Sequence, residues 1–241
     1  MDYSIIIPAY NEEQRISASI TKVLAYFRNK TDAFEVVLVD DGSTDDTVGK
    51  TREAAAGDQR VKILNLETNR GKGAAVRKGM IASQGARVLL TDADLSTPLT
   101  ELVQLEDALD QGFDIAIGSR GMQDSNLVRR QPLVREMAGK AGNLFIRVLC
   151  PSLWEYSDTQ CGFKLFSGDV ARRIFPLQRL DKFGFDVEVL YLARRRGYTI
   201  AEVPVAWAHN TGSKVKSTDY LYTFFEIMCV RINEVTGKYS D

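Results

Sequence analysis

Short apolar runs alternate with longer stretches of mixed polarity through the first half of the chain. Five runs are rich in Ile, Val, Leu and Phe and have the length of strands. The stretches between them have a helical character. Strands that alternate with helices are typical of a doubly wound α/β domain with a mostly parallel sheet. The predicted strands cover residues 3–7, 34–39, 61–66, 86–91 and 114–118.

The second half follows a less regular pattern, and no low-complexity linker or internal repeat separates it from the first. We therefore predict a single α/β domain over residues 1–241. The expected elements of this half are a basic, partly apolar helix over 134–149, a strand at "FKLF", helices over 169–175 and 186–196, a strand at "TIAEVPV", and an aromatic-rich helix over 220–235.

Two helix starts carry capping signals. Ser43 followed by Asp46 resembles a capping box. Thr97 precedes Pro98 and Glu101, which suits an N-cap, a proline at the first helical position and an early acidic residue. Each strand end is therefore expected to open onto a loop and then a helix.

Polar sequences follow all five predicted strands. In open α/β sheets, ligands bind outside the carboxyl ends of the strands. We therefore expect a site at this edge of the sheet, built from "PAYNEE", "DDGSTDD", "NRGKG", "DADLSTP" and "GSRG".

The composition narrows the chemistry. Lys and Arg number 31 against 32 Asp and Glu, for a formal net charge of −1, so no global field draws the protein to nucleic acid. The three cysteines are widely spaced and form no C-x-x-C pair, which argues against a disulfide framework or a structural zinc site. The chain has one histidine, so carboxylates, arginines and lysines must carry most of any catalysis.

The first residues, "MDYSIIIPAYNEE", lack the features of a cleaved signal, and no segment approaches the roughly 18 consecutive apolar residues of a membrane span. We expect a cytoplasmic protein. If it works at a membrane, it does so as a peripheral protein on the cytoplasmic face.

Asp92 and Asp94 are candidates for metal binding. If the preceding strand extends to Asp94, both side chains point to the same face. Two close carboxylates repel each other, and a hard ion such as Mg²⁺ or Mn²⁺ binds one or two carboxylates together with diphosphate oxygens. In the alternative interpretation, one Asp caps the helix near Pro98 and the other is solvated.

Two further loops have the chemistry of a nucleotide site. In the adjacent pair Asp40 and Asp41, one carboxylate can reach a ribose or base while the other anchors the turn; turn chemistry alone is the alternative. Gly71 and Lys72 lie in "NRGKG", which resembles a glycine-rich loop without the G-x-G-x-x-G or Walker A spacing.

Three basic residues are candidates for anion binding: Arg120 in "GSRG", Arg135 after "QPLV" and Lys214 in "TGSKV". Arginine suits bidentate phosphate contacts, and lysine supplies a single point charge. Each of the three alone is also typical of a solvated surface. They can form an anion-binding site only if the fold brings them together.

The motifs also occur in a characteristic order: "SIIIPAYNEE", "VVLVDDGSTDDT", "NRGKGAAVRKG", "LLTDADLSTP", "DIAIGSR", "DTQCGFKLF", "FGFDVEVLYLARRRGY", "EVPVAW" and "GSKV". The set spans nearly the whole chain. It resembles family 2 glycosyltransferases of the GT-A fold, most closely the dolichyl-phosphate β-glucosyltransferases, with dolichyl-phosphate mannose synthases as near relatives. Ser96 and the segment 161–163 favour the glucosyl branch, because the mannosyl branch usually has Gln and Ser-Gly-Phe there.

The resemblance implies inverting, metal-dependent transfer of glucose from UDP-glucose to a polyprenyl phosphate of the dolichyl type. Residues 1–120 would form the nucleotide-sugar and metal half, and residues 121–241 the acceptor half. The implied nucleotide-sugar site contains Pro8, Tyr10, Glu12, Asp41, Gly71, Lys72 and Asp92. Mg²⁺ or Mn²⁺ would bind Asp92 and Asp94. The implied catalytic residues are Asp94, Arg120, Arg135, Lys214 and Asp158.

Three acidic residues of the second half differ in their expected roles. Asp158 in "DTQCGF" is a candidate base by resemblance. An acceptor phosphate is already anionic at neutral pH, however, so Asp158 could equally orient the acceptor or a basic residue. For Asp186 and Glu188 in "FGFDVEVLY" we favour a structural role, through buried hydrogen bonds to neighbouring loops.

Two segments offer apolar surface to a membrane. The helix over 134–149 places Arg135, Lys140 and Arg147 among apolar residues, as in an interfacial helix, and the helix over 220–235 is a second candidate. Core packing or a homodimer contact is the alternative for both, and we favour it for the terminal helix.

Two other functions stay open at this point. One is a glycosyltransferase of the same fold that uses another nucleotide sugar or a soluble or protein-bound acceptor. The other is a non-catalytic protein that binds a nucleotide sugar.

Overall fold

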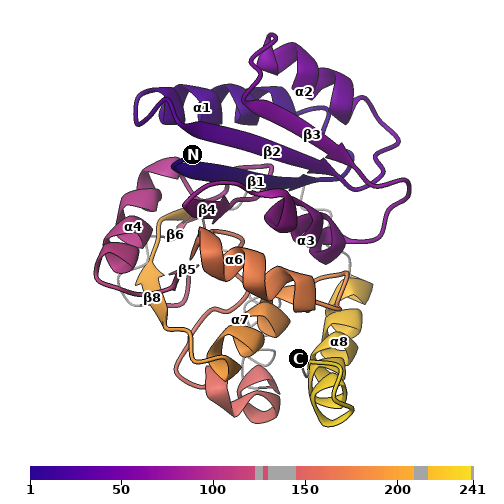
Figure 1. Ribbon diagram of the computed structural model, residues 1–241. Coiled ribbons are helices and arrows are strands. Elements are labelled where there is room, and N and C mark those ends of the chain that lie inside the picture. Colours follow the sequence, from indigo (N-terminus) through magenta and orange to yellow (C-terminus); the bar gives the residue numbers. More distant parts are fainter. Residues whose placement is uncertain (123–126, 130–144, 209–216, 240–241) are drawn as a thin grey trace.

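The structure is a computed structural model that describes residues 1–122, 127–129, 145–208 and 217–239. Its centre is one seven-stranded sheet flanked by helices (Figure 1), which confirms the predicted α/β class. All neighbouring strands are parallel except β7, which is antiparallel to both β4 and β5. The spatial order is β3 (Val61–Asn65), β2 (Phe34–Asp40), β1 (Tyr3–Ala9), β4 (Arg87–Leu90), β7 (Lys164–Ser167), β5 (Ile115–Ser119) and β8 (Ile200–Pro204).

Strand β1 shows why the apolar runs form the centre of the sheet. All seven of its residues are buried. Ile6 packs into one hydrophobic core, whereas Ile5 and Ile7 pack into the other, as the two-residue repeat of a strand requires. A strand covered on both faces needs a nearly continuous apolar sequence, and that is the signal the sequence carries.

The helices cover the two faces of the sheet unequally (Figure 1). The core on one face is completed by α1 (Ile16–Arg28) and α4 (Leu102–Asp110), and α2 (Thr47–Ala55) packs against α1. The core on the other face is completed by α3 (Lys72–Ala82), α6 (Gly168–Ile174), α7 (Phe185–Arg195) and α8 (Ser217–Val235). Three short 3₁₀ turns join these elements: η1 (Leu99–Glu101), η2 (Pro151–Leu153) and η3 (Phe175–Leu177).

Both predicted capping signals are wrong in detail. Helix α2 begins at Thr47 with Asp46 in the cap position, and the Ser43 hydroxyl instead accepts a hydrogen bond from the Asn11 amide at 2.8 Å. Pro98, and not Thr97, stands before η1, so the turn begins one residue later than predicted. The Ser43 side chain thus serves a neighbouring loop, which local sequence could not reveal.

The second half contains one pairing that the pattern did not predict. A small sheet pairs β6 (Leu127–Arg129) with β9 (Trp207–Ala208) in parallel. The strand expected at "FKLF" is present as β7. Of the helix expected over 134–149, residues 145–149 are helical, and 134–144 lie outside the described residues.

The described elements agree with two further expectations. All three cysteines are free. Within residues 1–122, 127–129, 145–208 and 217–239, no helix combines the length and the apolar character needed to cross a membrane.

Candidate active site

The loops after β1 and β2 are joined to each other. The Asn11 side chain accepts a hydrogen bond from the Thr44 amide at 2.7 Å, and the Glu12 amide donates to the Thr47 hydroxyl at 2.6 Å. Asn11 has a φ of 54°, a left-handed conformation that asparagine tolerates better than most residues. Pro8 ends up inside β1, and Tyr10 and Glu12 lie in the loop that follows. Three predicted nucleotide residues are thus at or next to the carboxyl end of β1.

Asp40 and Asp41 both anchor backbone. Asp40 accepts from the Ser43 amide at 3.1 Å, and Asp41 accepts from the amides of Arg70 and Gly71, both at 2.8 Å. Burial raises the pKa of Asp41, while the two amides oppose that rise. Asp41 therefore supports the glycine loop, and its contact with a nucleotide stays a prediction.

The glycine loop "NRGKG" packs tightly against residues 181–182. A Cβ on Gly71 would lie 2.5 Å from the Asp181 carbonyl oxygen, and the φ of Gly71 is 116°, so the position requires glycine. The amides of Gly73 and Ala74, in the first turn of α3, donate to the carbonyls of Lys182 and Asp181. Because these amides are occupied, anion binding here falls to the Lys72 side chain.

Lys72 points toward the carboxylates that follow β4. Its ammonium group lies 2.5 Å from Oδ1 of Asp92. Burial alone lowers the pKa of Lys72, but the nearby charges of Asp92 and Asp186 outweigh it and hold the pKa above its usual value. A charged lysine therefore stands beside Asp92 in this state of the protein.

Strand β4 ends at Leu90, four residues before Asp94. The expectation that Asp92 and Asp94 share one face of an extended strand is therefore wrong, because residues 91–94 leave the sheet and Leu95 adopts a φ of 47°. Oδ1 of Asp94 accepts from the Ser96 amide at 2.9 Å, and Oδ2 lies 3.9 Å from the Arg15 guanidinium. The turn, and not the pleat, sets the positions of the two carboxylates.

Asp92 also rests directly on Gly162. A Cβ on Gly162 would lie 2.1 Å from Oδ2 of Asp92, so any side chain there would displace the carboxylate. The next strand, β7, begins at Lys164, whose buried ammonium donates to the Cys161 carbonyl and to Asp186, each at 2.5 Å. The buried Lys164–Asp186 pair thus fixes the backbone on which Asp92 lies.

Arg120 follows β5 and binds Asp158. Nε and Nη2 of Arg120 donate to the Asp158 carboxylate at 2.6 and 2.9 Å, and the Arg120 amide adds a third bond at 3.1 Å. Burial alone raises the pKa of Asp158, but the guanidinium outweighs it and holds the pKa below its usual range. Of the two roles left open for Asp158, these contacts favour orientation of a basic residue.

Arg120 also feels the charge of Asp92. Burial alone lowers the pKa of Arg120, but the charge of Asp158 and, to a smaller extent, that of Asp92 outweigh it. The guanidinium carbon lies 5.6 Å from the centre of the Trp207 ring. The fold therefore brings Lys72, Asp92, Asp94 and Arg120 to one region. Arg135 and Lys214, the other two predicted cations, lie outside the described residues.

The structural role expected for Glu188 is confirmed. Glu188 is fully buried and accepts hydrogen bonds from the amides of Arg179 and Leu180 and from the Tyr239 hydroxyl. Asp186 is buried as expected, with the side chain of Lys164 as its partner. Both residues support the loop and strand behind the site.

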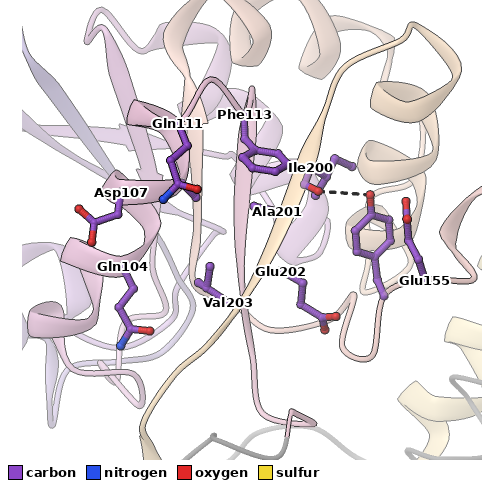
Figure 2. A pocket seen from close by; sticks show the side chains of 11 residues that line it. Gln104, Asp107, Gln111, Phe113, Glu155, Ile200, Ala201, Glu202 and Val203 are labelled. Carbon is purple, nitrogen blue, oxygen red and sulfur yellow. Dashed lines mark hydrogen bonds between the residues drawn. The ribbon is translucent and has the colours of Figure 1, made fainter.

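Glu202 was missed at the sequence level. It lies on β8, and its carboxylate accepts from the amides of Ser157 and Asp158 at 2.8–2.9 Å. Figure 2 shows Glu202 on the wall of a cavity of about 440 Å³ between α4 and β8. A carboxylate inside an otherwise apolar strand, "TIAEVPV", was the available signal, because even a half-buried charge is stabilised by hydrogen-bond partners.

Comparison with known proteins agrees with this arrangement. The family model described as glycosyl transferase family 2 matches residues 4–175. A dolichyl-phosphate β-glucosyltransferase of Dictyostelium discoideum is 35% identical over 224 residues, which cover 88% of this chain and 68% of the relative. The human dolichyl-phosphate β-glucosyltransferase is 33% identical, with coverage of 98% and 76%.

The fold also occurs among solved structures. A crystal structure of glucosyl-3-phosphoglycerate synthase from Mycobacterium tuberculosis, in complex with Mn²⁺, UDP-glucose and glycerol 3-phosphate, has a TM-score of 0.69 and 19% identity, and the match covers 98% of this chain and 80% of that one. The structure of the same enzyme with Mg²⁺ and UDP has a TM-score of 0.70. Together with the family match over more than half of the sequence, these findings show that the chain belongs to glycosyl transferase family 2.

Proposed function

We propose that the protein transfers glucose from UDP-glucose to the phosphate of a polyprenyl lipid of the dolichyl type. The observation that carries the proposal is the meeting of Lys72, Asp92 and Arg120 at one edge of the sheet, in a chain whose relatives are dolichyl-phosphate β-glucosyltransferases. Bringing a phosphate monoester to a diphosphate sugar crowds negative charge. Cations from separate loops are what such a reaction needs.

In the proposed reaction, an oxygen of the acceptor phosphate attacks the anomeric carbon of glucose. The bond from that carbon to the diphosphate breaks, and UDP leaves with the bonding electrons. Attack opposite the leaving group inverts the α-linkage of UDP-glucose to the β-linkage in the relatives' name. Arg120 would hold a phosphate of the donor or the acceptor, and Asp158 would keep its guanidinium in place.

Asp92 and Asp94 supply the carboxylate oxygens that a hard divalent ion binds. In this structure Oδ1 of Asp92 is paired with the ammonium of Lys72 and Oδ2 rests against Gly162, so an ion would take the place of Lys72 at Asp92. The described residues contain no cluster of three Asp, Glu, His or Cys, so two carboxylates would have to be completed by donor phosphates, as Mg²⁺ commonly is. When bound, Mg²⁺ or Mn²⁺ would neutralise charge on the departing diphosphate.

The structural neighbours support a second candidate acceptor. They were solved in complex with glycerol 3-phosphate and with phosphoglyceric acid, which are soluble and phosphorylated. A small phosphorylated acceptor would use the same cations. The lipid acceptor is preferred because the more similar relatives, at 33–36% identity, are named for dolichyl phosphate.

The test is a donor and acceptor screen on the full chain. Protein, UDP-[¹⁴C]glucose and Mg²⁺ or Mn²⁺ are incubated with polyprenyl phosphate, polyprenol or 3-phosphoglycerate, and the label is partitioned between organic solvent and water. We expect organic-extractable glucose with polyprenyl phosphate alone. Label found only on 3-phosphoglycerate would replace the lipid with a soluble acceptor. UDP binding without turnover on any acceptor, with UDP-galactose, UDP-N-acetylglucosamine and GDP-mannose also tried, would identify a non-catalytic binding protein.

A lipid acceptor also determines where in the cell the protein must act. The proposed reaction requires the site to reach a phosphate at a bilayer surface, so the protein would act as a peripheral protein on the cytoplasmic face of a membrane.

A further inference from the structure

Among the described residues, helix α8 has one face that packs against no other element. Ile227, Val230 and Asn233 are buried against the rest of the protein, and they lie three residues apart, on one side of the helix. The opposite side is mostly apolar at its exposed positions, with Arg231 as an exposed cation among them. We call the side chains of Tyr222, Phe225, Met228, Ile232 and Val235 the α8 apolar face; their exposed fractions range from 41% to 82%.

The α8 apolar face begins next to the candidate active site. The Lys182 ammonium lies 4.2 Å from the centre of the Tyr222 ring. On the next turn of α8, Glu226 accepts hydrogen bonds from the amides of Lys182 and Gly184 at 3.1 and 2.8 Å. The Lys182 carbonyl in turn accepts from Gly73, in the loop that carries Lys72. The helix is therefore tied through one short loop to the glycine loop of the site.

We propose that the α8 apolar face docks on the surface of a phospholipid bilayer and so brings the site to its lipid acceptor. The inference rests on the proposed function, because a polyprenyl phosphate presents its phosphate at the bilayer surface while its chain stays in the hydrocarbon. In Figure 1, α8 lies at the margin of the helical layer beside α7, so the face is on the periphery of the molecule.

The chemistry of the face fits a bilayer. An apolar stripe with an aromatic residue and a lysine at one end is typical of helices that lie in the membrane interface, where tyrosine rings and lysine stems are favoured. A second copy of the chain fits less well. The five side chains together expose on the order of 500 Å², short of the roughly 800 Å² per partner in a standard protein interface.

The experiment measures vesicle binding by the full chain, without sugar nucleotide. Vesicles of phosphatidylcholine, with and without a minor fraction of phosphatidylserine, are sedimented with wild-type protein or with Phe225→Ser/Ile232→Ser. The chain offers a matched control in Ile81→Ser/Val103→Ser, since Ile81 and Val103 are each 49% exposed on α3 and α4. A second double variant, Met228→Ser/Val235→Ser, tests the same face independently in case the first variant fails to fold. Thermal unfolding shows whether each variant is folded.

We expect each α8 pair to weaken vesicle binding at least about tenfold, since each change removes an apolar side chain that the bilayer would bury. The control should bind like the wild type, and all variants should unfold at the wild-type temperature. Equal vesicle binding by the wild type and the α8 variants, or no binding by the wild type, would overturn the proposal. So would a wild-type dimer that the α8 changes convert to monomer in size-exclusion chromatography, because the occupant would then be a second copy.

An activity measurement separates this inference from the proposed function. With a short, water-soluble prenyl phosphate, the α8 variants should turn over like the wild type, whereas with polyprenyl phosphate in vesicles they should lose at least about tenfold in rate. If vesicle binding depends on α8 but neither acceptor is glucosylated, the proposed function fails and the docking surface stands. If both acceptors are glucosylated at equal rates by all variants, the docking surface fails and the function stands.

Discussion

The Arg120 guanidinium donates two hydrogen bonds to the Asp158 carboxylate, from a position 38 residues earlier in the chain. Asp158 is 8% exposed, so the pair is largely shielded from water on the carboxylate side. A planar guanidinium that donates from both Nε and Nη2 to one carboxylate is fixed in direction as well as in position. We therefore interpret Asp158 as a positioning residue that aims Arg120.

The first prediction concerns this pair. Asp158→Asn should lower kcat/KM by about a hundredfold, the typical loss when one contact of a preorganised site is misplaced. When Asp158→Asn is added to the Arg120→Ala variant, kcat/KM should fall little further, because Asp158 acts through Arg120. Steady-state kinetics of the four proteins gives the answer. Full additivity of the two losses would restore Asp158 as a candidate base.

The pH dependence follows from the lowered pKa of Asp158. A carboxyl group with a folded-state pKa below its unfolded value of about 3.9 stabilises the fold above that value, and the stabilisation is lost as pH falls through the folded-state pKa. The wild type should therefore be more stable than Asp158→Asn near neutral pH, and this difference in stability should become smaller as the pH falls. Thermal unfolding from pH 7 downward tests this, and a gap that widens toward acid would contradict it.

The second prediction concerns Glu202. Glu202→Gln removes the charge that the amides of Ser157 and Asp158 face, so Asp158 should hold Arg120 less firmly and kcat/KM should fall about tenfold. The matched control is Glu155→Gln, because Glu155 lines the same cavity but pairs with Arg194 at 3.3 Å.

A positioning role for Glu202 also predicts which substrate is affected. Glu202→Gln should change the donor KM and the acceptor KM in the same ratio as Arg120→Lys does. A different ratio, or an equal loss in Glu155→Gln, would mean that Glu202 does not work through Arg120.

The third prediction concerns the metal. Asp94→Asn should reduce turnover about a hundredfold and weaken Mn²⁺ binding, followed by electron paramagnetic resonance in the presence of UDP. Chelation by EDTA should abolish wild-type turnover, and Mg²⁺ or Mn²⁺ should restore it. Asp169→Asn is the control, since the Asp169 side chain is 83% exposed on α6. Unchanged turnover in Asp94→Asn would refute the metal assignment.

The fourth prediction concerns the contact between Gly162 and Asp92. Gly162→Ala places a methyl group 2.1 Å from the carboxylate oxygen, so Asp92 must move and Mn²⁺–UDP binding should weaken at least about tenfold. Gly121→Ala is the steric control, because its Cβ would meet no atom closer than 3.5 Å. Isothermal titration calorimetry measures both. Wild-type affinity in Gly162→Ala would show that the position of Asp92 is not critical.

The fifth prediction concerns stability behind the site. Tyr239→Phe removes the hydroxyl that donates to buried Glu188 at 2.5 Å, which should cost about 1–3 kcal/mol in the free energy of unfolding. Tyr198→Phe makes the same change at a half-buried position and should cost less. Urea unfolding gives both values.

Glu188 also gives this prediction a pH dependence. Burial raises the pKa of Glu188, so its contribution to stability is present at low pH and declines as pH rises through the folded-state pKa. Tyr239 donates to the charged form, and the penalty of Tyr239→Phe should therefore grow as pH rises above the unfolded-state value of about 4.3. A penalty that stays constant with rising pH would contradict this.

Much of the fold follows from local pattern because the central strands are buried on both faces. Strands such as β1 and β2 contain continuous apolar runs, at residues 5–7 and 36–39, and such runs indicate strands that are covered on both faces. Strand β7 shows the limit. Its sequence predicts a strand, but its antiparallel place between β4 and β5 depends on pairings more than 40 residues away.

The sequence predicted those site residues that come directly after the end of a strand. Lys72, Asp92 and Arg120 come from three such loops, and the sheet brings them together. The supporting contacts of Lys164 and Gly162 were not predictable, because their partners Asp186 and Asp92 are remote in sequence. For Glu202 the sequence marked an unusual carboxylate but not its partners. The backbone hydrogen bonds of Asp41 to the glycine loop were likewise hidden from the sequence.

Because β7 runs against its neighbours, the chain leaves the sheet after Ser119 and returns to it at Lys164 on the same edge, where the Gly118 amide donates to the Phe163 carbonyl at 2.9 Å. Segment 120–163 is thus an excursion whose two ends lie side by side, and it contains both Arg120 and Asp158. The segment also contains β6 and buried core residues such as Cys150 and Leu153. We therefore expect changes in this segment to alter acceptor preference and stability together.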